Sequence, residues 1–203
     1  MVSCFIKQLH AHLQFLTMEK KRCLWPAEDA LMIQYHDEEW GIPIHDDRKL
    51  FEFLVLDTFQ AGLSWRTILY KRQAFRKAFA NFNAKKVAKF DEVKMERLMQ
   101  DKGIIRNRLK IKGTVTNAQL FLEIQKEFGA FDQYIWEFTN GKTLTNKRKD
   151  QNNIPATSSE SDAMSADLRK RGFKFVGSTI CYAFMQAAGM VNDHLTSCFC
   201  YKR

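Results

Sequence analysis

Apolar residues recur along most of this chain at the three- and four-residue spacing of amphipathic helices. The clearest groups are Leu50, Phe51, Leu54 and Val55, then Phe75, Phe79 and Phe82, and then Val87, Phe90, Val93 and Leu98. No run of four or more residues alternates cleanly between apolar and polar, so at most an incidental sheet is expected. With helices of about a dozen residues each, the pattern predicts an all-α fold, a compact bundle of about eight to ten helices.

The second half of the chain adds two helices and a loop to this prediction. Residues 175–192 form an apolar segment that is too short and too polar to cross a bilayer, and they predict a buried helix. Before it, Ser161 is expected to cap a helix that runs towards Arg171 and stops at Gly172. The polar passage 140–162 predicts a surface loop rather than a boundary between two domains.

Composition and charge narrow the class of protein. The chain has 203 residues, 45% of them hydrophobic and 17 of them Phe, which excludes a disordered tail or a disulfide-stapled miniprotein. The formal net charge of +9 makes DNA, RNA or an acidic membrane surface the default partner. The first 17 residues have no basic start followed by an apolar block, so no secretory signal is expected. The five Cys residues should then stay reduced, as structural, reactive or metal-binding thiols.

The segment 96–112 contains a predicted break between two helices. One helix is expected to end at 101–103, and the next to begin after a short turn with the basic residues Arg106, Arg108, Lys110 and Lys112. Gly103 would allow a positive φ there, which turns backbone N–H groups outward together. Outward N–H groups ringed by cations form a seat for phosphate. The alternative is an ordinary corner between helices with a solvated basic face.

Four Cys and His residues form two pairs near opposite ends of the chain. Cys23 and His36 lie 13 positions apart, and His194 and Cys198 lie 4 positions apart, so the second pair can face one way from a single helical turn. Two thiolates and two imidazoles suit tetrahedral zinc in a structural site. Neither pair has the spacing of a zinc finger and Cys200 is a competing thiol, so buried thiols and hydrogen-bonded imidazoles without a metal are the alternative.

Aromatic residues gather around one acid in the first third of the chain. Trp25, Tyr35, Trp40 and Trp65 flank an apolar run whose single acid is Asp57. A buried carboxylate either has a partner in the protein or awaits one in a ligand. Flat aromatic walls around one anion would bind a flat, positively charged ring by stacking and cation–π attraction. The alternatives are structural: the rings belong to the core, and the acid caps the next helix at its N-terminus.

Taken together, these residues lie in segments that resemble the DNA-3-methyladenine glycosylase I family, within the helix-hairpin-helix glycosylase superfamily. The resemblance spans residues 18–201, and its motifs are RCLW, YHDEEWG, QAGLSW, GIIRNR, KRGFKFVGSTICYAFMQA and VNDH followed by CFCY. It implies a single glycosylase domain, residues 18–203, with a helix-hairpin-helix element around residues 92–122. Residues 1–17 have no counterpart and are expected to be a dispensable N-terminal extension.

The resemblance also implies which residues form the site. The extruded base would be bound by Trp25, Tyr35, Asp57 and Trp65, with Trp40 near them, and catalysis would involve Asp57 and Tyr35. Gly62 and Leu63 would lie at the DNA, and residues 103–108 match the family's hairpin. Together with the basic residues of that turn, the expected DNA contacts are Gly62, Leu63, Gly103, Arg106, Arg108 and Lys110. One structural zinc ion, joining the N- and C-terminal segments, would be held by Cys23, His36, His194 and Cys198.

By the same resemblance, the chain would be a monomeric, cytoplasmic bacterial enzyme of base-excision repair that needs no membrane. It would hydrolyse the N-glycosidic bond of 3-methyladenine in alkylated double-stranded DNA by flipping the base into the aromatic pocket. No Lys stands in the pocket-lining segments to form a Schiff base, so strand cleavage is not expected. The chain departs from the family's pattern at Asp57, where the family usually has Glu, and at Met32, where better-studied members have an aromatic residue.

Two other functions remain open from the sequence. One is a zinc-stabilised DNA-binding module that recognises damage without chemistry, which the shorter acid at position 57 favours. The other is a hydrolase of free nucleosides, whose activity would not depend on Arg106 or Arg108. Asp132 is expected to be a turn or capping acid with no catalytic role.

Overall fold

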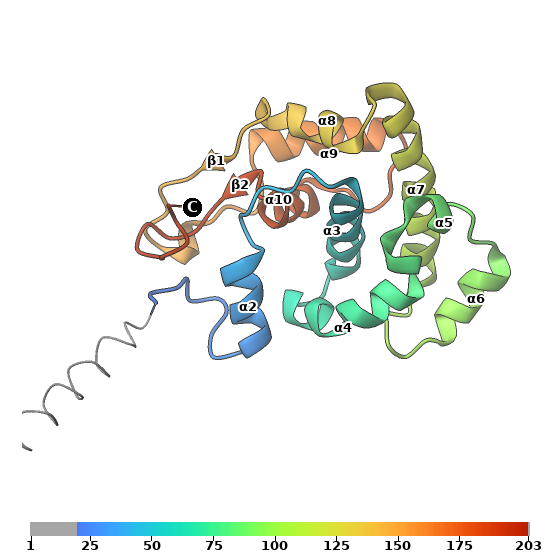
Figure 1. The fold of residues 1–203 in the computed structure, drawn as a ribbon, viewed down its shortest axis with the longest axis horizontal. Coiled ribbons are helices and arrows are strands. Elements are labelled where there is room, and N and C mark those ends of the chain that lie inside the picture. Colours follow the sequence, from blue (N-terminus) through green and yellow to red (C-terminus); the bar gives the residue numbers. More distant parts are fainter. Residues whose placement is uncertain (1–19, 203) are drawn as a thin grey trace, which may run out of the picture.

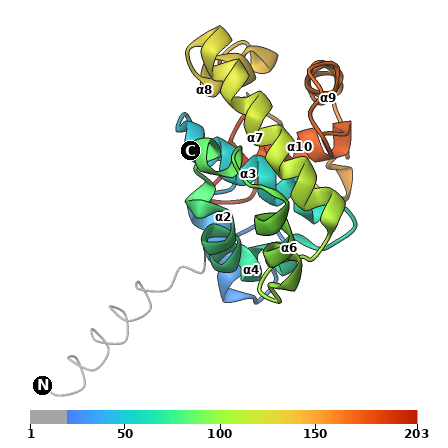
Figure 2. The same cartoon turned by 90° about the vertical axis from the view of Figure 1, so that its right-hand side faces the viewer.

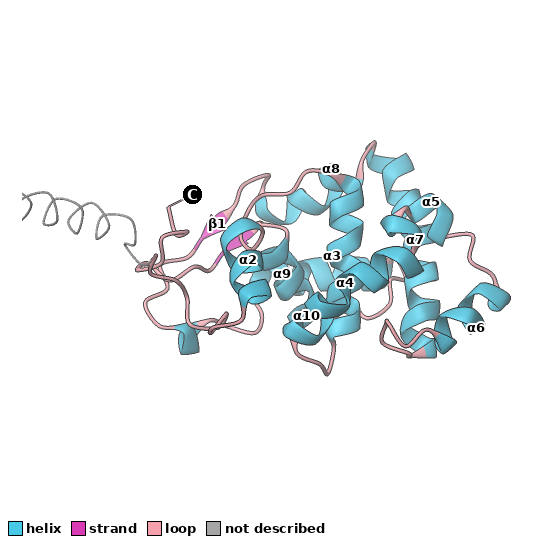
Figure 3. Cartoon of the chain, turned by 60° about the horizontal axis from the view of Figure 1, so that its bottom comes forward, coloured by secondary structure: helices cyan, strands magenta, loops and turns pink. Residues whose placement is uncertain are grey.

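A computed structural model describes residues 20–202, so the predicted extension at residues 1–17 lies outside the described residues. Helices make up most of the described chain (Figures 1 and 3). The α-helices are α2 (Ala30–Glu38), α3 (Asp47–Gln60), α4 (Trp65–Ala78), α5 (Ala84–Val87), α6 (Glu92–Gln100), α7 (Arg108–Phe128), α8 (Phe131–Trp136), α9 (Ser159–Lys170) and α10 (Ser178–Ala187). Shorter elements are the 3-10 helices η1 (Ala80–Phe82), η2 (Glu137–Thr139) and η3 (Gln151–Asn153) and the strands β1 (Leu144–Thr145) and β2 (Val191–Asn192). Nine α-helices within residues 20–202 confirm the predicted, mostly helical fold.

The central helix is α3, which lies in the middle of the bundle (Figure 1). Every residue from 50 to 59 is buried, and α4, α7, α8 and α10 all pack against this helix. A helix covered on all sides belongs to a core, yet α3 also carries Glu52, Asp57 and Thr58 into the interior. Two of the carboxylates of α3, those of Glu52 and Asp57, are therefore buried.

Phe side chains fill much of the core around α3. Phe59 packs edge-on against Phe75 of α4 with 4.8 Å between ring centroids, and Phe121 of α7 stacks on Phe131 of α8 at 4.2 Å. These residues are fully buried. The helical spacing of apolar residues in the sequence therefore identifies the core well, with an exception at Val93, which is 58% exposed on α6.

The C-terminal segment lies beside two earlier parts of the chain. Its strand β2 forms a parallel pair with β1, in which Leu144 is opposite Val191, and Figure 3 draws both strands in magenta. The backbone N–H of Phe199 donates to the carbonyl of Lys21 at 2.9 Å. These contacts place the C-terminal segment next to α2 (Figure 1), and the short pair agrees with the expectation of no more than an incidental sheet.

Two predicted helices have different bounds in the structure. The N-cap of α9 is Ser158 rather than Ser161, because the two side chains form a reciprocal capping box one turn earlier than predicted. The apolar segment 175–192 is helical only in α10, and β2 follows it. Between them Gly189 has φ +70°, and an added Cβ would lie 2.2 Å from the backbone of Ile42, so the chain must turn there.

The helices α6 and α7 are joined by a turn at residues 101–107, within the segment where the sequence predicts a hairpin. Figure 2 shows α7 running across the molecule from α6 to α8, and both helices contact it. Among the described residues, no helix has the length and apolar character needed to cross a membrane.

Candidate functional site

A cavity of about 290 Å³ is bounded by α2, α3, α4 and α10 and by the segment around η3. Its walls are formed by Trp25, Tyr35, Trp40, Asp57, Gln60, Trp65, Gln151, Ile154, Ala183 and Gln186. The structure thus brings together all four residues predicted to bind a base, and it places Trp40 beside them.

The aromatic walls stand at steep angles to one another. The rings of Tyr35 and Trp65 lie 5.1 Å apart and are tilted by 48°, and Trp25 lies edge-on to Tyr35 at 6.1 Å. Phe53 of α3 stacks against Trp65 at 6.5 Å. The indole Nε1 atoms of Trp25 and Trp65 are buried without a hydrogen-bond partner among residues 20–202. The rings therefore form part of a lined hollow rather than a closed core, since buried indole N–H groups normally have an acceptor.

Asp57 lies in the last turn of α3 and is 2% exposed. Its Oδ2 has no hydrogen-bond partner in the described part of the chain. Burial raises the pKa of Asp57 well above its ordinary value, and the positive charge of Arg72 opposes this rise. The alternative in which Asp57 caps the next helix is wrong, because Ser64 is the N-cap of α4 and accepts from the N–H of Thr67. A buried carboxylate with a raised pKa that lines a cavity is typical of a functional group.

Tyr35 shares this environment. It is buried in α2, and desolvation raises the pKa of its hydroxyl well above the ordinary value, with the negative charges of Asp57 and Glu39 adding to the rise. The hydroxyl is therefore a hydrogen-bond donor at neutral pH rather than a phenolate. The cavity thus offers one donor on Tyr35 and one acceptor on Asp57 between aromatic walls.

The sequence did not identify Gln60, Gln151, Ile154, Ala183 and Gln186 as lining residues. Two of them come from the passage 140–162, which is not only a surface loop as predicted. Here η3 and the following Ile154 reach the cavity, and Oε1 of Gln151 accepts the backbone N–H of Leu24 at 3.1 Å, next to Trp25. An isolated large apolar residue within a polar passage is the signal that could have located this wall.

The predicted wedge residues Gly62 and Leu63 lie in the turn between α3 and α4, which we call the 61–64 loop. Gly62 has φ +81° with no atom within 4 Å of an added Cβ, and Leu63 is 41% exposed. Gln60 and Trp65, on either side of this loop, both line the cavity. The loop therefore lies directly beside the cavity and presents an apolar side chain to solvent.

Gly103 does not have the conformation that the sequence analysis expects. It is not among the residues of positive φ, and its N–H donates to Oδ1 of Asp101 at 2.8 Å instead of pointing outward. The position needs glycine for a steric reason, because an added Cβ would lie 2.9 Å from Cβ of Ala74. The predicted phosphate seat at this amide is therefore wrong.

The three basic residues of the predicted DNA interface differ in their surroundings. Arg106 is exposed, and Arg108 is exposed but paired with Glu96. Lys110 is only 6% exposed, and its Nζ donates to the carbonyls of Phe59 and Ala61 at 2.9 and 2.7 Å. Its ammonium group points into the protein, so the prediction that Lys110 binds DNA directly does not fit the structure.

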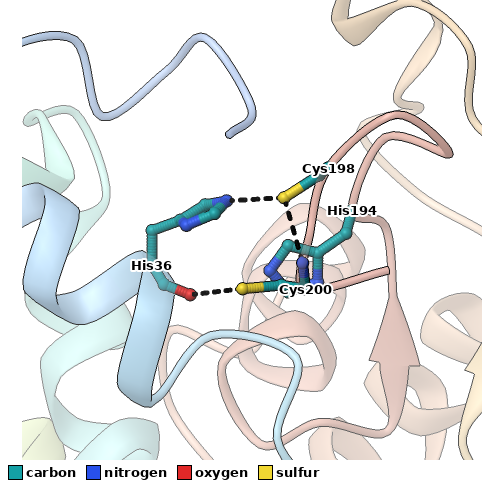
Figure 4. A group of neighbouring side chains, drawn as sticks. All are labelled: His36, His194, Cys198 and Cys200. Carbon is teal, nitrogen blue, oxygen red and sulfur yellow. Dashed lines mark hydrogen bonds between the residues drawn. The ribbon is translucent and has the colours of Figure 1, made fainter. Parts of the chain in front are cut away.

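A second cluster lies where α2 meets the C-terminal segment. The ligand atoms of His36, His194, Cys198 and Cys200 all lie within 4.8 Å of one another, and Figure 4 shows His36 facing the other three. Nε2 of His36 lies 3.5 Å from Sγ of Cys198. Sγ of Cys23 accepts the backbone N–H of Leu195, the residue after His194, at 3.4 Å. Burial raises the pKa of the Cys23 thiol to about 12, and neighbouring Cys198 adds to the rise. Three of the four predicted ligands therefore meet together with the competing thiol Cys200, whereas Cys23 is not part of this group and borders it through Leu195 and Cys198.

The imidazoles of this cluster are held by neighbouring side chains. Nδ1 of His36 lies 2.8 Å from Oδ1 of Asp37, and Nδ1 of His194 lies 2.9 Å from Oδ1 of Asn192. Such contacts orient metal-binding imidazoles and leave Nε2 for the ion. Trp40 connects the cluster to the cavity, since it lines the cavity and its ring lies 4.6 Å from that of His194.

Backbone donors distinguish the three thiols. Sγ of Cys23 accepts the N–H of Leu195, and Sγ of Cys198 accepts the N–H of Cys200, each at 3.4 Å. The thiol of Cys200 instead faces the carbonyl oxygen of His36 at 4.0 Å, as a donor. The sulfur atoms of Cys23 and Cys198 are therefore hydrogen-bond acceptors, whereas Cys200 acts as a donor.

Comparisons with known proteins give a consistent result. A family model described as Methyladenine glycosylase matches residues 25–201. The curated protein DNA-3-methyladenine glycosylase 1 of Escherichia coli (strain K12) is 48% identical over 181 residues, which cover 89% of this chain and 97% of the relative. DNA-3-methyladenine glycosylase of Haemophilus influenzae (strain ATCC 51907 / DSM 11121 / KW20 / Rd) is 45% identical over 179 residues, or 88% of this chain and 97% of the relative.

Solved structures resemble the fold closely. A crystal structure of 3-methyladenine DNA glycosylase I superimposes with a TM-score of 0.87 at 47% identity and covers 89% of this chain and 99% of the other. A structure of the Staphylococcus aureus enzyme, described as the structural basis of 3-methyladenine recognition, gives a TM-score of 0.85 at 34% identity and covers 88% and 95% of the two chains.

Proposed function

Since this chain belongs to the methyladenine glycosylase family, we propose that it excises 3-methyladenine from alkylated double-stranded DNA. It hydrolyses the N-glycosidic bond and releases the free base. The curated relatives carry the names of enzymes, so a non-catalytic damage-binding module is not proposed. The observation that carries the proposal is the aromatic cavity with the buried carboxylate of Asp57, whose Oδ2 lacks a partner among the described residues.

The chemistry of the lesion matches this cavity. An adenine methylated at N3 carries a positive charge, which stacks favourably on electron-rich aromatic faces and is attracted to a carboxylate. In our proposal Trp25 and Trp65 stack on the base and the hydroxyl of Tyr35 hydrogen-bonds to it. Asp57 accepts an N–H of the exocyclic amine. Neutral adenine gains no charge attraction from Asp57, so the same groups discriminate against the intact base.

The reaction needs little acid catalysis. When the bond between the sugar and the base breaks, its electron pair moves to the base and neutralises the positive charge. Water adds to the sugar carbon and loses its proton. The protein must unstack and extrude the nucleotide, at a cost of a few kcal/mol, and stabilise the positive charge that develops on the sugar as the base leaves. None of the residues that line the cavity is a Lys, so no Schiff base forms and the strand stays intact.

The proposed DNA interface combines the 61–64 loop with the hairpin of α6 and α7. In this interface Leu63 fills the gap that the extruded base leaves. Residues 92–122 form a helix-hairpin-helix element, and its exposed residues Arg106 and Arg108 contact phosphates of the DNA. The net charge of +9 favours this encounter. In this proposal the enzyme acts as a monomer in the bacterial cytoplasm, where its DNA substrate lies.

We also propose one structural zinc ion held by Cys23, His36, His194 and Cys198. Zinc takes such a set of two sulfur and two nitrogen ligands in tetrahedral sites, where bonds of about 2.0 to 2.3 Å separate ligand atoms by roughly 3.3 to 3.8 Å. The 3.5 Å between Nε2 of His36 and Sγ of Cys198 fits this geometry. With four protein ligands the ion has no open position, so its contribution is stability. It fixes Trp25 and Tyr35, which adjoin the ligands in sequence.

Release of free 3-methyladenine from methylated duplex DNA tests the proposed function. The wild type is expected to release the base without strand breaks, and Asp57→Asn to be slower by on the order of 100-fold because the transition-state charge loses its anion. Asp57→Glu, which has the length of the family's usual acid, is expected to retain activity. Unchanged release by Asp57→Asn would show that negative charge is not required, and no release by folded wild type would refute the proposal.

A further inference from the structure

Lys110 is a buried cation that the proposed chemistry does not use. It lies in the first turn of α7 and donates two hydrogen bonds to carbonyls at the end of α3, those of Phe59 and Ala61. Lysine is almost never fully buried unless it has partners. Burial also lowers the pKa of Lys110 below its ordinary value. The position therefore has a specific function that outweighs the cost of desolvation.

The contacts of Lys110 fix the point where the chain leaves α3. The last four carbonyls of a helix have no partner within it, and a cation at that end satisfies them and the helix dipole. Ala61 is the C-cap of α3 and the first residue of the 61–64 loop. Beyond it, Gly62 and Leu63 are exposed, and an added Cβ at Gly62 would meet nothing within 4 Å. The two hydrogen bonds from Lys110 therefore anchor the start of this loop to α7.

These contacts connect the hairpin and the cavity. The α7 end of the hairpin carries Lys110, and α3 carries Asp57 in the turn that Lys110 caps. We propose that Lys110 is a positioning residue, which transmits the placement of the hairpin on DNA to the 61–64 loop and holds Leu63 in the gap left by the extruded base. This inference rests on the proposed function. In this proposal Lys110 does not contact a DNA phosphate and instead binds the carbonyls of Phe59 and Ala61 within the protein.

Variants of two lysines on α7 test this assignment. Lys110→Met removes the two donors at similar side-chain length, and Lys112→Met removes the same charge from an exposed position two residues later. Lys110→Met is expected to slow excision from methylated duplex about tenfold. The slope of log affinity against log salt and the affinity for free 3-methyladenine should not change. A phosphate contact would instead lower that slope by about 0.9, and this result would overturn the proposal.

A double-mutant cycle with Leu63→Ala gives the decisive readout. If Lys110 acts through the loop, Leu63→Ala should slow excision about tenfold in the wild type and have almost no effect in Lys110→Met, whereas it should keep its full effect in Lys112→Met. Additive effects of Lys110→Met and Leu63→Ala would refute the coupling. If Lys110→Met does not fold, as judged by thermal unfolding, Lys110→Gln enters the same cycle. Failure of the wild type to release any base would refute the proposed function instead.

Discussion

Two carboxylates on the buried helix α3 have opposite surroundings. Oε1 of Glu52 accepts from Nε of Arg72 at 2.5 Å and lies 2.8 Å from a guanidinium nitrogen of Arg76. Asp57, five positions later, has an Oδ2 without a hydrogen-bond partner among the described residues. The Glu52 carboxylate is paired with two guanidinium groups within the protein, whereas the Asp57 carboxylate has no such pair and lines a cavity.

This difference separates a group that stabilises the fold from one that awaits a ligand. Removing a member of a complete buried ion pair costs stability because the partner charge stays buried. Removing an unpaired buried charge increases stability, because the folded protein no longer has to keep that charge out of water. With the proposed zinc ion bound, the cluster of His36 and Cys198 would also be a complete buried group, since Asp37 and Asn192 already orient its imidazoles. The comparison predicts effects on stability of opposite sign, and four experiments challenge it.

The largest effect is expected at the metal cluster. Cys198→Ser should lose the one zinc ion per chain that we propose and most of the folding free energy, because structural zinc contributes on the order of 10 kcal/mol in small zinc domains. Elemental analysis and thermal unfolding measure both quantities. Cys181→Ser is the matched control, since Cys181 is buried in α10 outside the cluster. If Cys198→Ser lacks metal but stays folded and stable, the cluster does not stabilise the fold through a zinc ion.

The next effect concerns Glu52. Glu52→Ala should lower the free energy of unfolding by about 3 to 5 kcal/mol, because Arg72 is left buried with Glu39 as its remaining carboxylate partner. Urea denaturation measures this loss. Glu96→Ala, which breaks the exposed pair with Arg108, should change stability little. Equal losses in the two variants would mean that burial of the pair has no energetic weight.

Asp57→Asn is expected to change stability in the opposite direction. At pH 7 the variant should be more stable than the wild type by on the order of 1 to 3 kcal/mol, because the desolvated carboxylate is gone, while base release is slower by on the order of 100-fold. The folded-state pKa of Asp57 is raised, so the folded wild type binds more protons than the unfolded chain above the ordinary carboxyl pKa of about 4. Wild-type stability should therefore fall as pH rises from about 4 towards the raised pKa.

Denaturation of both proteins between about pH 4 and 8 checks this sign. The difference in stability between Asp57→Asn and the wild type should widen with increasing pH and then level off. The expected excess stability together with reduced activity would be the trade-off seen at sites that are strained for function. Parallel pH curves would show that Asp57 is not ionised at a cost in the folded protein.

The sequence predicted which residues of α3 are buried better than it predicted which residues of other helices they contact. Helical spacing located the buried faces. The aromatic residues around Asp57 have types that suit one ligand, but only the resemblance to the glycosylase family assigned them to a pocket. Glu52 lies in the same apolar run, yet no pattern revealed its partner Arg72, since that pairing depends on how α3 packs on α4. Local chemistry is thus readable from sequence, whereas partners across helices are not.

The same limit explains the errors at the hairpin. Gly103 and Lys110 were assigned to phosphate from residue type and order, but Asp101 takes the amide of Gly103 and α3 takes the ammonium of Lys110. The walls formed by Gln151 and Ile154 were missed for a related reason. They reach the cavity through a long-range fold of a polar passage, which carries no periodic signal.

The smallest effect is expected for two surface arginines, of which one is paired with a carboxylate and the other is not. Arg106 has no carboxylate partner among the described residues, whereas Arg108 is already paired with Glu96. Arg106→Gln should lower the salt slope of DNA binding by about 0.9, the value for one lost phosphate contact, and Arg108→Gln should lower it less. Because Glu96 competes with phosphate for Arg108, Glu96→Gln should tighten binding and steepen the slope. Titrations of abasic duplex at several salt concentrations measure all three variants. Equal slopes for Arg106→Gln and Arg108→Gln would mean that an existing ion pair does not reduce the contribution of a surface charge to DNA binding.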